Sequence, residues 1–399
     1  MTESGANFAQ VVARLKQGRA YSAQAPRGIV RLSHRTAAGE FVYTLDVPET
    51  YHPGRRYQVR VHLHGGVSRP EGTVRGSGAI GALAGAEQIY VIPYAWRDAP
   101  WWSEAQLQNL RAILDAVKRT YNVDENRVVV SGVSDGGTGA YYIAMRDTTP
   151  FASFLPLNGF IMVLASESLG IREELFPNGL RNKAFFVVNG GRDPLYPAAL
   201  VEPYVRHLQR GGVTLDYEPQ PDAGHNTAWW PQVKDAFEDF VRSHPRDPVP
   251  AALTWETDLT EGTNRAHWLV IDRLTAPAGP NPLIDLNDFV GERARPGGGT
   301  PRTVPIARPL FPRSRPSGRV DLVREGNTIR ATTRGVAELT LLISPDAFDL
   351  ARPITVVADG RPVFAGRVEP SVATLMKWAA RDNDRTMLFG DEIRVSLVP

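Results

Sequence analysis

Residues 127–145, RVVVSGVSDGGTGAYYIAM, change character at their midpoint. A run of β-branched apolar residues, typical of a buried strand, ends at Gly132, and helical potential begins after Gly136. Ser134 lies between these glycines and completes the pattern Gly-x-Ser-x-Gly. Between a strand and a helix, this pattern predicts a sharp turn that raises a serine hydroxyl above a sheet. The alternative is a glycine-rich connection with a surface serine.

Strand-like and helix-like segments alternate around this stretch, from about residue 25 to residue 245. Several of the strand-like segments are almost continuously apolar, as buried parallel strands are. Between them, 103–121 and 227–241 have helical periodicity. This alternation predicts an α/β fold, a mostly parallel sheet flanked by helices. The expected strands are 40–48, 57–64, 89–95, 127–132, 151–159, 184–190 and 213–219.

The character of the chain changes at a proline-rich linker, residues 246–252. Residues 253–399 contain short alternating segments separated by turn pairs, which predict a β-sandwich-like domain with one helix at 371–383. Residues 276–319 are rich in proline, glycine and arginine and are interpreted as a long insertion, either a solvated loop or a grip for an anionic surface. Residues 1–245 form the expected catalytic domain, with 1–25 as its N-terminal helical extension.

Composition excludes several classes of function. A net charge of +2 over 399 residues gives no argument for nucleic acid or an anionic membrane as partner, and no apolar run is long enough to span a bilayer. The absence of cysteine excludes disulfides, thiolate zinc sites and a cysteine nucleophile. The N-terminus lacks the features of a secretory signal. As written, the chain is expected in the cytoplasm, and a signal that has been removed would make it a secreted protein.

A serine nucleophile needs a histidine base, and the histidine needs a carboxylate that orients it. Asp193 follows the expected strand 184–190, and His225 lies in the loop after the last one, which gives the order serine, acid, histidine. Asp222 is the rival acid, although it is only three residues from His225. The alternative role for Asp193 is to cap the next helix.

The oxyanion of an acyl-transfer intermediate needs backbone donors. One is the amide of Asp135, directly after the nucleophile, and the second is expected in the loop 61–72, with Gly66 first and Val67 as the alternative. His62 and His64 form a His-x-His pair, but no third ligand is evident. No metal site is therefore expected.

At this point the sequence resembles the α/β-hydrolase superfamily. The residues that carry the likeness are LHGG (63–66), YNVDENRVVVSGVSDGGTGAYY (121–142), NGGRDPLYP (189–197) and AGHN (223–226). Within the superfamily it is most similar to the esterase group of feruloyl esterases, acetyl xylan esterases and polyhydroxybutyrate depolymerases. RDTTPFASFLPLNG (146–159) resembles bacterial esterase-like proteins that carry a β-rich C-terminal domain. The resemblance implies a serine hydrolase that acts through an acyl-enzyme and needs no cofactor. Asp135 departs from the pattern, because many such esterases have an apolar or amide side chain there, and we expect its carboxylate to turn away from the oxyanion, towards an arginine.

The expected substrate is a small-molecule or polymeric ester with an aromatic acyl group, an acetyl group or a polyester chain. Trp101, Trp102, Trp229 and Val67 are candidate substrate-binding residues, and the alternative is that the tryptophans only pack the loops. Two other functions stay open, a serine peptidase of the prolyl-oligopeptidase type and a non-catalytic binding protein on a hydrolase scaffold. Homodimerisation also stays open.

Overall fold

The computed structural model describes residues 7–71, 79–294 and 303–398. The chain forms two compact units, which do not follow one another along the sequence. The α/β unit comprises residues 21–246 and 285–312, and the β-rich unit comprises residues 1–20, 247–284 and 313–399. No helix in the described ranges is long and apolar enough to cross a membrane.

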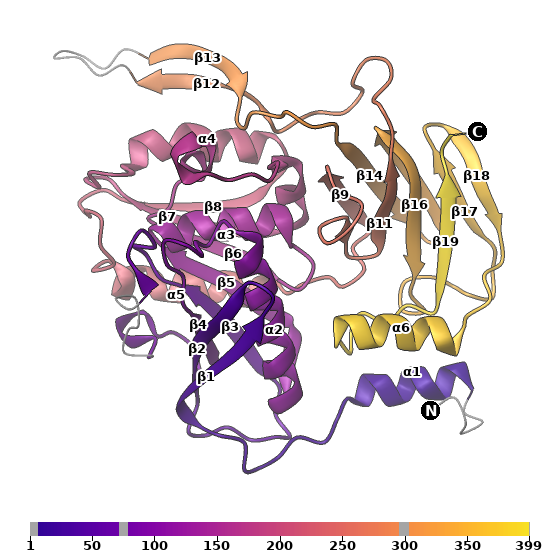
Figure 1. Ribbon diagram of the computed structural model, residues 1–399, viewed down its shortest axis with the longest axis horizontal. Coiled ribbons are helices and arrows are strands. Elements are labelled where there is room, and N and C mark those ends of the chain that lie inside the picture. Colours follow the sequence, from indigo (N-terminus) through magenta and orange to yellow (C-terminus); the bar gives the residue numbers. More distant parts are fainter. Residues whose placement is uncertain (1–6, 72–78, 295–302, 399) are drawn as a thin grey trace. The chain divides into compact units, whose positions relative to one another are not determined.

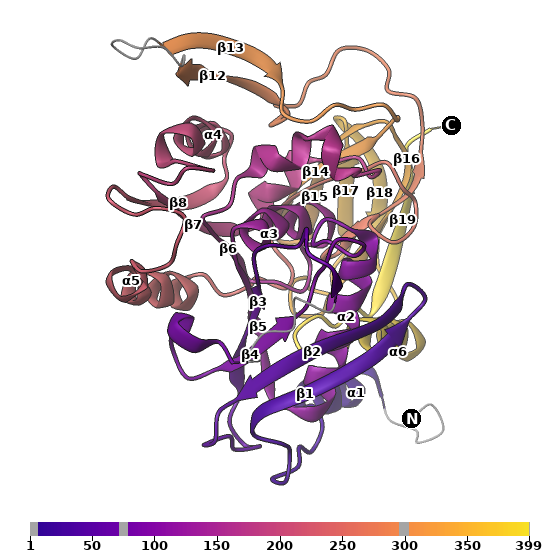
Figure 2. The same ribbon diagram turned by 60° about the vertical axis from the view of Figure 1, so that its left-hand side comes forward.

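The α/β unit is built on an eight-stranded sheet in the order β1-β2-β4-β3-β5-β6-β7-β8 (Figure 1). β1 pairs with β2 and β2 with β4 in antiparallel fashion, and all the remaining pairs are parallel. Figure 2 shows β1 and β2 at one end of the sheet and β8 at the other. The predicted α/β fold is confirmed. The strands are β1 (Gly28–Thr36), β2 (Gly39–Val47), β3 (Tyr57–Leu63), β4 (Ile89–Pro93), β5 (Val123–Val133), β6 (Ser153–Leu157), β7 (Ala184–Gly190) and β8 (Thr214–Gln220).

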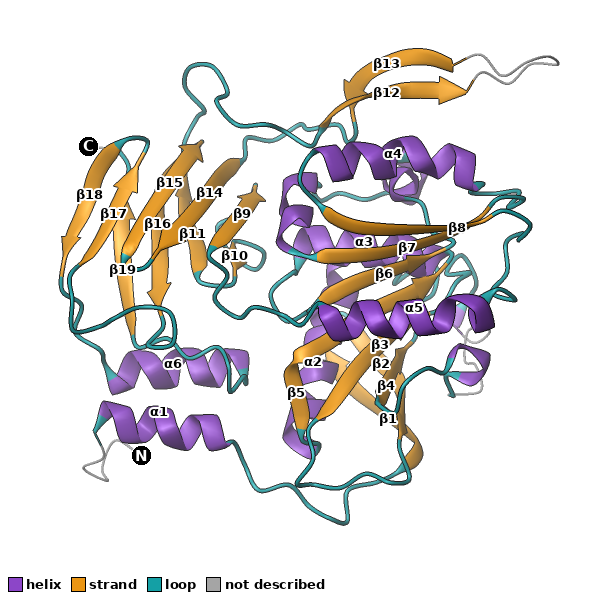
Figure 3. Ribbon diagram, turned by 180° about the vertical axis from the view of Figure 1, so that it is seen from behind, coloured by secondary structure: helices purple, strands orange, loops and turns teal. Residues whose placement is uncertain are grey.

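Helices cover both faces of this sheet because alternate residues of each strand point to opposite sides. Val128 and Val130 of β5 pack in the core cluster that contains α2 and α3, whereas Val129 packs in the cluster that contains α5 (Figure 3). The helices are α2 (Glu104–Thr120), α3 (Asp135–Arg146), α4 (Ala198–Arg210) and α5 (Trp230–Ser243), with short 3-10 helices η2 (Gly81–Leu83), η3 (Ile161–Ala165), η4 (Glu167–Leu169) and η5 (Pro177–Asn182).

The β-rich unit consists of two sheets that share one hydrophobic core. Its strands pair in antiparallel fashion except for β15 and β17, which are parallel. One sheet is β10 (Arg265–Ala266), β11 (Leu269–Leu274), β16 (Val336–Ile343) and β19 (Asp391–Ser396). The other is β18 (Arg361–Gly366), β17 (Ile354–Ala358), β15 (Thr328–Arg334), β14 (Gly318–Glu325) and β9 (Ala252–Thr257).

The N-terminal helix α1 (Phe8–Gln17) also belongs to the β-rich unit. It packs against α6 (Val372–Asp382), where Val11 shares a small apolar cluster with Leu375 and Leu388. The sequence predicts residues 1–25 as an extension of the α/β domain, but residues 7–20 belong to the other unit; residues 1–6 lie outside the described ranges.

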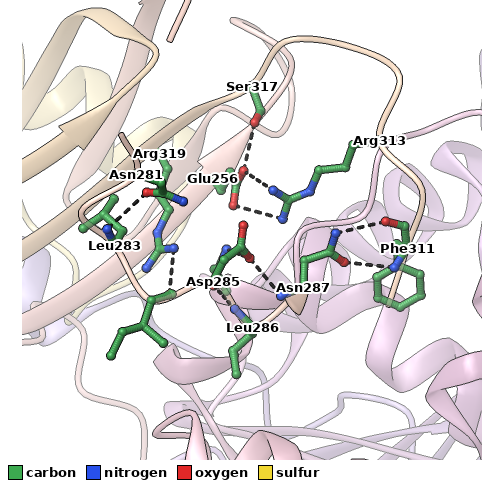
Figure 4. A network of polar contacts seen from close by, with 12 residues as sticks. Glu256, Asn281, Leu283, Asp285, Leu286, Asn287, Phe311, Arg313, Ser317 and Arg319 are labelled. Atoms are coloured by element: carbon green, nitrogen blue, oxygen red, sulfur yellow. Dashed lines mark hydrogen bonds and ion pairs between the residues drawn. The ribbon is translucent and has the colours of Figure 1, made fainter. Parts of the chain in front are cut away.

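Residues 285–312 differ most from expectation, because they form a hairpin that belongs to the α/β unit, β12 (Asp288–Ala294) paired with β13 (Thr303–Pro309). The interpretation of 276–319 as a solvated loop is wrong for this part, since four of its apolar side chains, Leu286, Phe289, Leu310 and Phe311, are buried in the α/β core. Asn287 closes the base of the hairpin by donating to Phe311 O at 3.0 Å and accepting from Phe311 N at 2.9 Å (Figure 4). Residues 295–302, which connect the two strands in the sequence, lie outside the described ranges.

Polar contacts within the β-rich unit order the chain on either side of this hairpin. Glu256 on β9 accepts from Ser317 at 2.8 Å and pairs with Arg313 at 3.2 Å (Figure 4). Arg319 on β14 donates to Ile284 O at 2.9 Å. These arginines are therefore engaged by partners of their own unit.

Candidate active site

Ser134 lies on the turn between β5 and α3 with φ 58° and ψ −119°, a backbone conformation that residues other than glycine rarely adopt. Its amide donates to Leu157 O at 2.9 Å. The flanking glycines are required by close backbone approach: a Cβ at Gly132 would lie 2.2 Å from Gly136 O, and one at Gly136 would lie 2.0 Å from Leu63 O. The small residues of the sequence pattern therefore allow the strained turn that projects the serine hydroxyl.

A chain of hydrogen bonds joins Ser134 to His225 and Asp193. The Oγ of Ser134 lies 2.8 Å from His225 Nε2, and His225 Nδ1 lies 2.6 Å from Asp193 Oδ2. The Asp193 side chain is fully buried, and its other oxygen accepts from the amides of Leu195 at 2.8 Å and Tyr196 at 3.0 Å. Because an ionised carboxylate only accepts, His225 donates from Nδ1 and its Nε2 accepts the serine proton.

The acid and base loops approach each other closely because a glycine pair ends β7. A Cβ at Gly190 would lie 2.4 Å from Ala223 O, and one at Gly191 would lie 2.4 Å from Pro221 O. The glycine pair is visible in the sequence as NGGRDPLYP, from which only Asp193 was predicted to be functional. Arg192 N donates to Ala223 O at 2.9 Å and fixes the two loops to each other.

The rival acid Asp222 is not part of the hydrogen-bond chain. Its carboxylate pairs with Arg192 at 2.7 Å, and its side chain is 85% exposed. The structure thus brings Asp193, and not Asp222, to the imidazole.

Asp135 turns away from the serine, but its partner is not an arginine. Its Oδ2 accepts from the amide of Val67 at 2.9 Å. Since that amide is engaged, Val67 is not available as an oxyanion donor, which leaves the amides of Gly66 and Asp135 as candidates. The loop lies directly against the nucleophile, because a Cβ at Gly65 would be 2.9 Å from Ser134 Cβ. The unusual carboxylate therefore ties the candidate oxyanion loop to the first residue of α3.

His64 and Trp101 form hydrogen bonds to the backbone of the same loop. His64 Nε2 accepts from Ala95 N at 3.1 Å, so its Nδ1 carries the proton and donates to Gly65 O at 2.9 Å. Burial lowers the pKa of His64 and favours this neutral form. Trp101 Nε1 donates to His64 O at 2.8 Å.

The His-x-His pair is held by hydrogen bonds within the α/β unit. Both ring nitrogens of His64 are engaged, and His62 Nδ1 lies 3.1 Å from Ser131 Oγ in the sheet interior. Burial, together with the charge of Arg60, lowers the pKa of His62 to about 3. Across the described part of the chain, no group of three metal-ligating side chains comes together.

The four residues expected to line the substrate site are buried in the core. Trp101 is 0% exposed, Val67 2%, Trp229 5% and Trp102 7%. Trp101 packs beneath α3, where a Cβ at Gly139 would lie 2.4 Å from Trp101 Cβ. Side chains with so little accessible surface favour the alternative, in which the tryptophans pack the loops.

The aromatic side chain beside the base is Tyr196, which sequence reasoning missed. Its ring lies edge-on to His225 with centroids 5.8 Å apart, and Phe160 lies 6.0 Å beyond it. Phe160 in turn contacts Tyr204 at 5.2 Å, edge to face. Burial and the charges of Asp135 and Asp193 raise the pKa of Tyr196, which keeps its phenol protonated. No periodicity marks a tyrosine in a loop, so only the three-dimensional structure identifies this neighbour.

The strand order and the strained serine between β5 and α3 define the α/β-hydrolase fold. No family model and no curated protein matches the sequence. Among solved structures, the chain is similar to a thermostable esterase at 19% identity and a TM-score of 0.42, over 55% of this chain and 63% of that one. It is also similar to a feruloyl esterase module from Clostridium thermocellum, at 18% identity and a TM-score of 0.39, over 56% of this chain and 89% of the other. A third is an S-formylglutathione hydrolase from Agrobacterium tumefaciens, at 14% identity and a TM-score of 0.42, over 56% and 98%. At such identities these likenesses say nothing about the substrate of this chain.

Proposed function

We propose that this protein is a serine carboxylic ester hydrolase. The observation that carries the proposal is the hydrogen-bond chain from Ser134 through His225 to Asp193, with links of 2.8 and 2.6 Å. A serine hydroxyl becomes an effective nucleophile when a neighbouring base accepts its proton and a carboxylate orients that base.

The proposed reaction has two halves. Ser134 Oγ attacks the ester carbonyl carbon while its proton moves to His225 Nε2, and the amides of Gly66 and Asp135 stabilise the resulting oxyanion. The imidazolium then protonates the leaving alcohol, which departs and leaves an acyl-serine. In the second half His225 deprotonates a water that attacks the acyl carbon, and the acid is released as Ser134 regains its proton. Asp193 stays ionised throughout and stabilises the imidazolium.

An aromatic or apolar acyl group is the substrate class we favour. Tyr196 is partly exposed beside the base and continues into Phe160 and Tyr204. Flat aromatic side chains at a reacting centre favour apolar groups on the substrate. This supports aromatic-acyl or polyester substrates over acetyl esters.

The test is a panel of para-nitrophenyl and feruloyl esters set against aminoacyl anilides, with a fluorophosphonate probe. We expect ester turnover, and covalent labelling that disappears in Ser134→Ala. Turnover of the anilides alone would favour a peptidase. A folded wild-type protein that the probe does not label would overturn the proposal in favour of a binding protein.

A further inference from the structure

The carboxyl end of β6 bonds to the backbone next to both the nucleophile and the base. Leu157, the last residue of this strand, accepts the amide of Ser134 at 2.9 Å. The next residue, Asn158, donates from its side-chain Nδ2 to the carbonyl oxygen of Asn226 at 2.8 Å. Asn226 directly follows His225, so two adjacent residues hold the backbone at both ends of the Ser134–His225 hydrogen bond.

We infer that Asn158 is a positioning residue for the histidine base, an inference that rests on the proposed function. His225 is the central residue of a tight turn in which Asn226 N donates to Gly224 O at 2.9 Å. Because Asn226 directly follows His225 in this turn, the bond to Asn226 O restricts where the imidazole can lie. Asn158 itself is fixed, because its amide donates to Val188 O of β7 at 2.7 Å.

The conformation and burial of Asn158 support this role. Its φ is 50°, in the left-handed region, where asparagine is among the few residues other than glycine that are tolerated. It is 0% exposed, and no partner for its Oδ1 is found among the described residues. An unsatisfied buried acceptor costs stability. An apolar residue would avoid that cost but would also lose the bond to Asn226. The Nδ2 donor, and not the Oδ1 acceptor, is therefore the group that makes asparagine suitable at this position.

A second buried asparagine ties the acid loop to the same region. Asn189 at the end of β7 donates to Gly159 O at 3.2 Å and to Tyr196 O at 3.4 Å. Tyr196 is one of the two residues whose amides donate to Asp193. The acid and the base are thus both connected to the residues that follow β6.

The decisive variant is Asn158→Gly, because glycine adopts a positive φ without strain and removes only the side-chain donor. We expect kcat with an aryl ester to fall about 10- to 100-fold, as small misplacements of a reacting group do. KM should change less than twofold, since Asn158 is buried and does not contact substrate. The rate of labelling by a fluorophosphonate should fall by the same factor as kcat.

Asn178→Ala is the matched control. Asn178 is also 0% exposed and holds another segment of the α/β unit, through bonds to Asp285 at 2.9 Å and Leu286 N at 2.8 Å. We expect a lower urea midpoint with kcat unchanged. A merely structural role for Asn158 would give the same result for both variants and would overturn the inference.

Should Asn158→Gly fail to fold, the wild-type protein supplies the second measurement. The Nδ2 protons of Asn158 should exchange with solvent as slowly as the core amides of β5, and fast exchange would overturn the inference. Unchanged kcat in a folded, labelled Asn158→Gly would overturn the inference alone. A wild-type protein that neither turns over esters nor reacts with the probe would overturn the proposed function, and the inference with it.

Discussion

Ser134 carries backbone strain, with a positive φ at a residue that has a Cβ. Such a conformation costs about 1–3 kcal/mol, which the surrounding structure must supply. Here the bond from Ser134 N to Leu157 O and the close packing of Gly132 and Gly136 maintain it. Glycine, which has no Cβ, would adopt this conformation without the steric cost.

Replacing Ser134 by glycine should therefore abolish ester turnover and stabilise the fold. We expect Ser134→Gly to raise the free energy of unfolding by about 1 kcal/mol relative to Ser134→Ala, because only glycine relieves the strained backbone. Urea denaturation of the two inactive variants measures the difference. Equal midpoints would show that the turn is not strained.

Asp135 offers a second test at this scale. Asp135→Ala removes the acceptor for Val67 N and loosens the candidate oxyanion loop, so we expect kcat to fall about tenfold, less than the loss of a whole oxyanion donor. Asp135→Asn keeps a side-chain oxygen at the same place and should retain most of the activity. If both variants lost activity equally in steady-state assays with an aryl ester, the charge and not the hydrogen bond would be the important feature.

His62 makes the stability of the α/β unit depend on pH. Its pKa is about 3 in the folded protein and near the ordinary value of 6.5 in the unfolded chain. Between these values only the unfolded chain takes up the proton, so the contribution of His62 is complete above pH 6.5 and is lost as the pH falls towards 3. From pH 7 to pH 4.5 this amounts to about 2.5 kcal/mol.

The measurement is urea denaturation at pH 7 and pH 4.5. The acid-induced loss should be smaller in His62→Gln by about that amount. His52→Gln, which changes an exposed histidine, is the control and should behave as the wild type does. An identical pH dependence in all three proteins would exclude His62 as the cause.

At the scale of elements, the β12–β13 hairpin completes the α/β core over α4. The ring of Phe289 stacks on Tyr204 with centroids 4.5 Å apart and lies 5.0 Å from the ring of His207. His207 Nε2 lies 2.8 Å from Leu286 O, so the hairpin is held by both apolar and polar contacts.

Truncation of Phe289 should accordingly cost as much as any core truncation. We expect Phe289→Ala, at a residue only 1% exposed, to lower the free energy of unfolding by about 3 kcal/mol. Val290→Ala is the matched control, because its side chain is 64% exposed on the same strand and should change stability by less than about 0.5 kcal/mol. Equal, small effects in urea denaturation would mean that the hairpin is only a surface loop.

How well an element could be predicted depended on how much of it is buried. The strands β2 to β7 carry enough buried apolar residues to be recognised, whereas β1 has no buried residue and was missed. β8 was recognised although only Leu215 of it is buried. The β12–β13 hairpin was missed because its composition is that of a loop and few of its side chains reach the core.

The site residues divide in a similar way. Ser134, Asp193 and His225 could be predicted because a strand, a turn and the chain order limit where each can lie. Asn158 and Tyr196 are single residues after strands, with no period or spacing to mark them. The sequence left the role of the tryptophans open, because a bulky aromatic residue in a loop gives the same sequence signal whether it is accessible or buried.

At the scale of the whole molecule, the chain passes between its two units at residues 20/21, 246/247, 284/285 and 312/313. No single cut therefore separates them. A fragment spanning 21–246 lacks the four buried side chains of 285–312, and we expect it to melt at a lower temperature than the same fragment fused to 285–312.

Thermal unfolding and fluorophosphonate labelling of the two fragments would test this. The fused fragment should recover both the higher midpoint and the labelling at Ser134. If 21–246 alone matched it in both assays, the hairpin would be dispensable to the α/β unit.

The pairing of α1 with α6 has a consequence for the order in which the protein is made. α1 ends at Gln17 and α6 begins at Val372, so about 350 residues must be translated before the two helices can meet. At ribosomal speeds this interval is on the order of tens of seconds, during which the apolar stripe of α1 has no permanent partner on the nascent polypeptide. The α/β sheet lies wholly within this interval and can assemble first, so the β-rich unit is the last part of the protein to become complete.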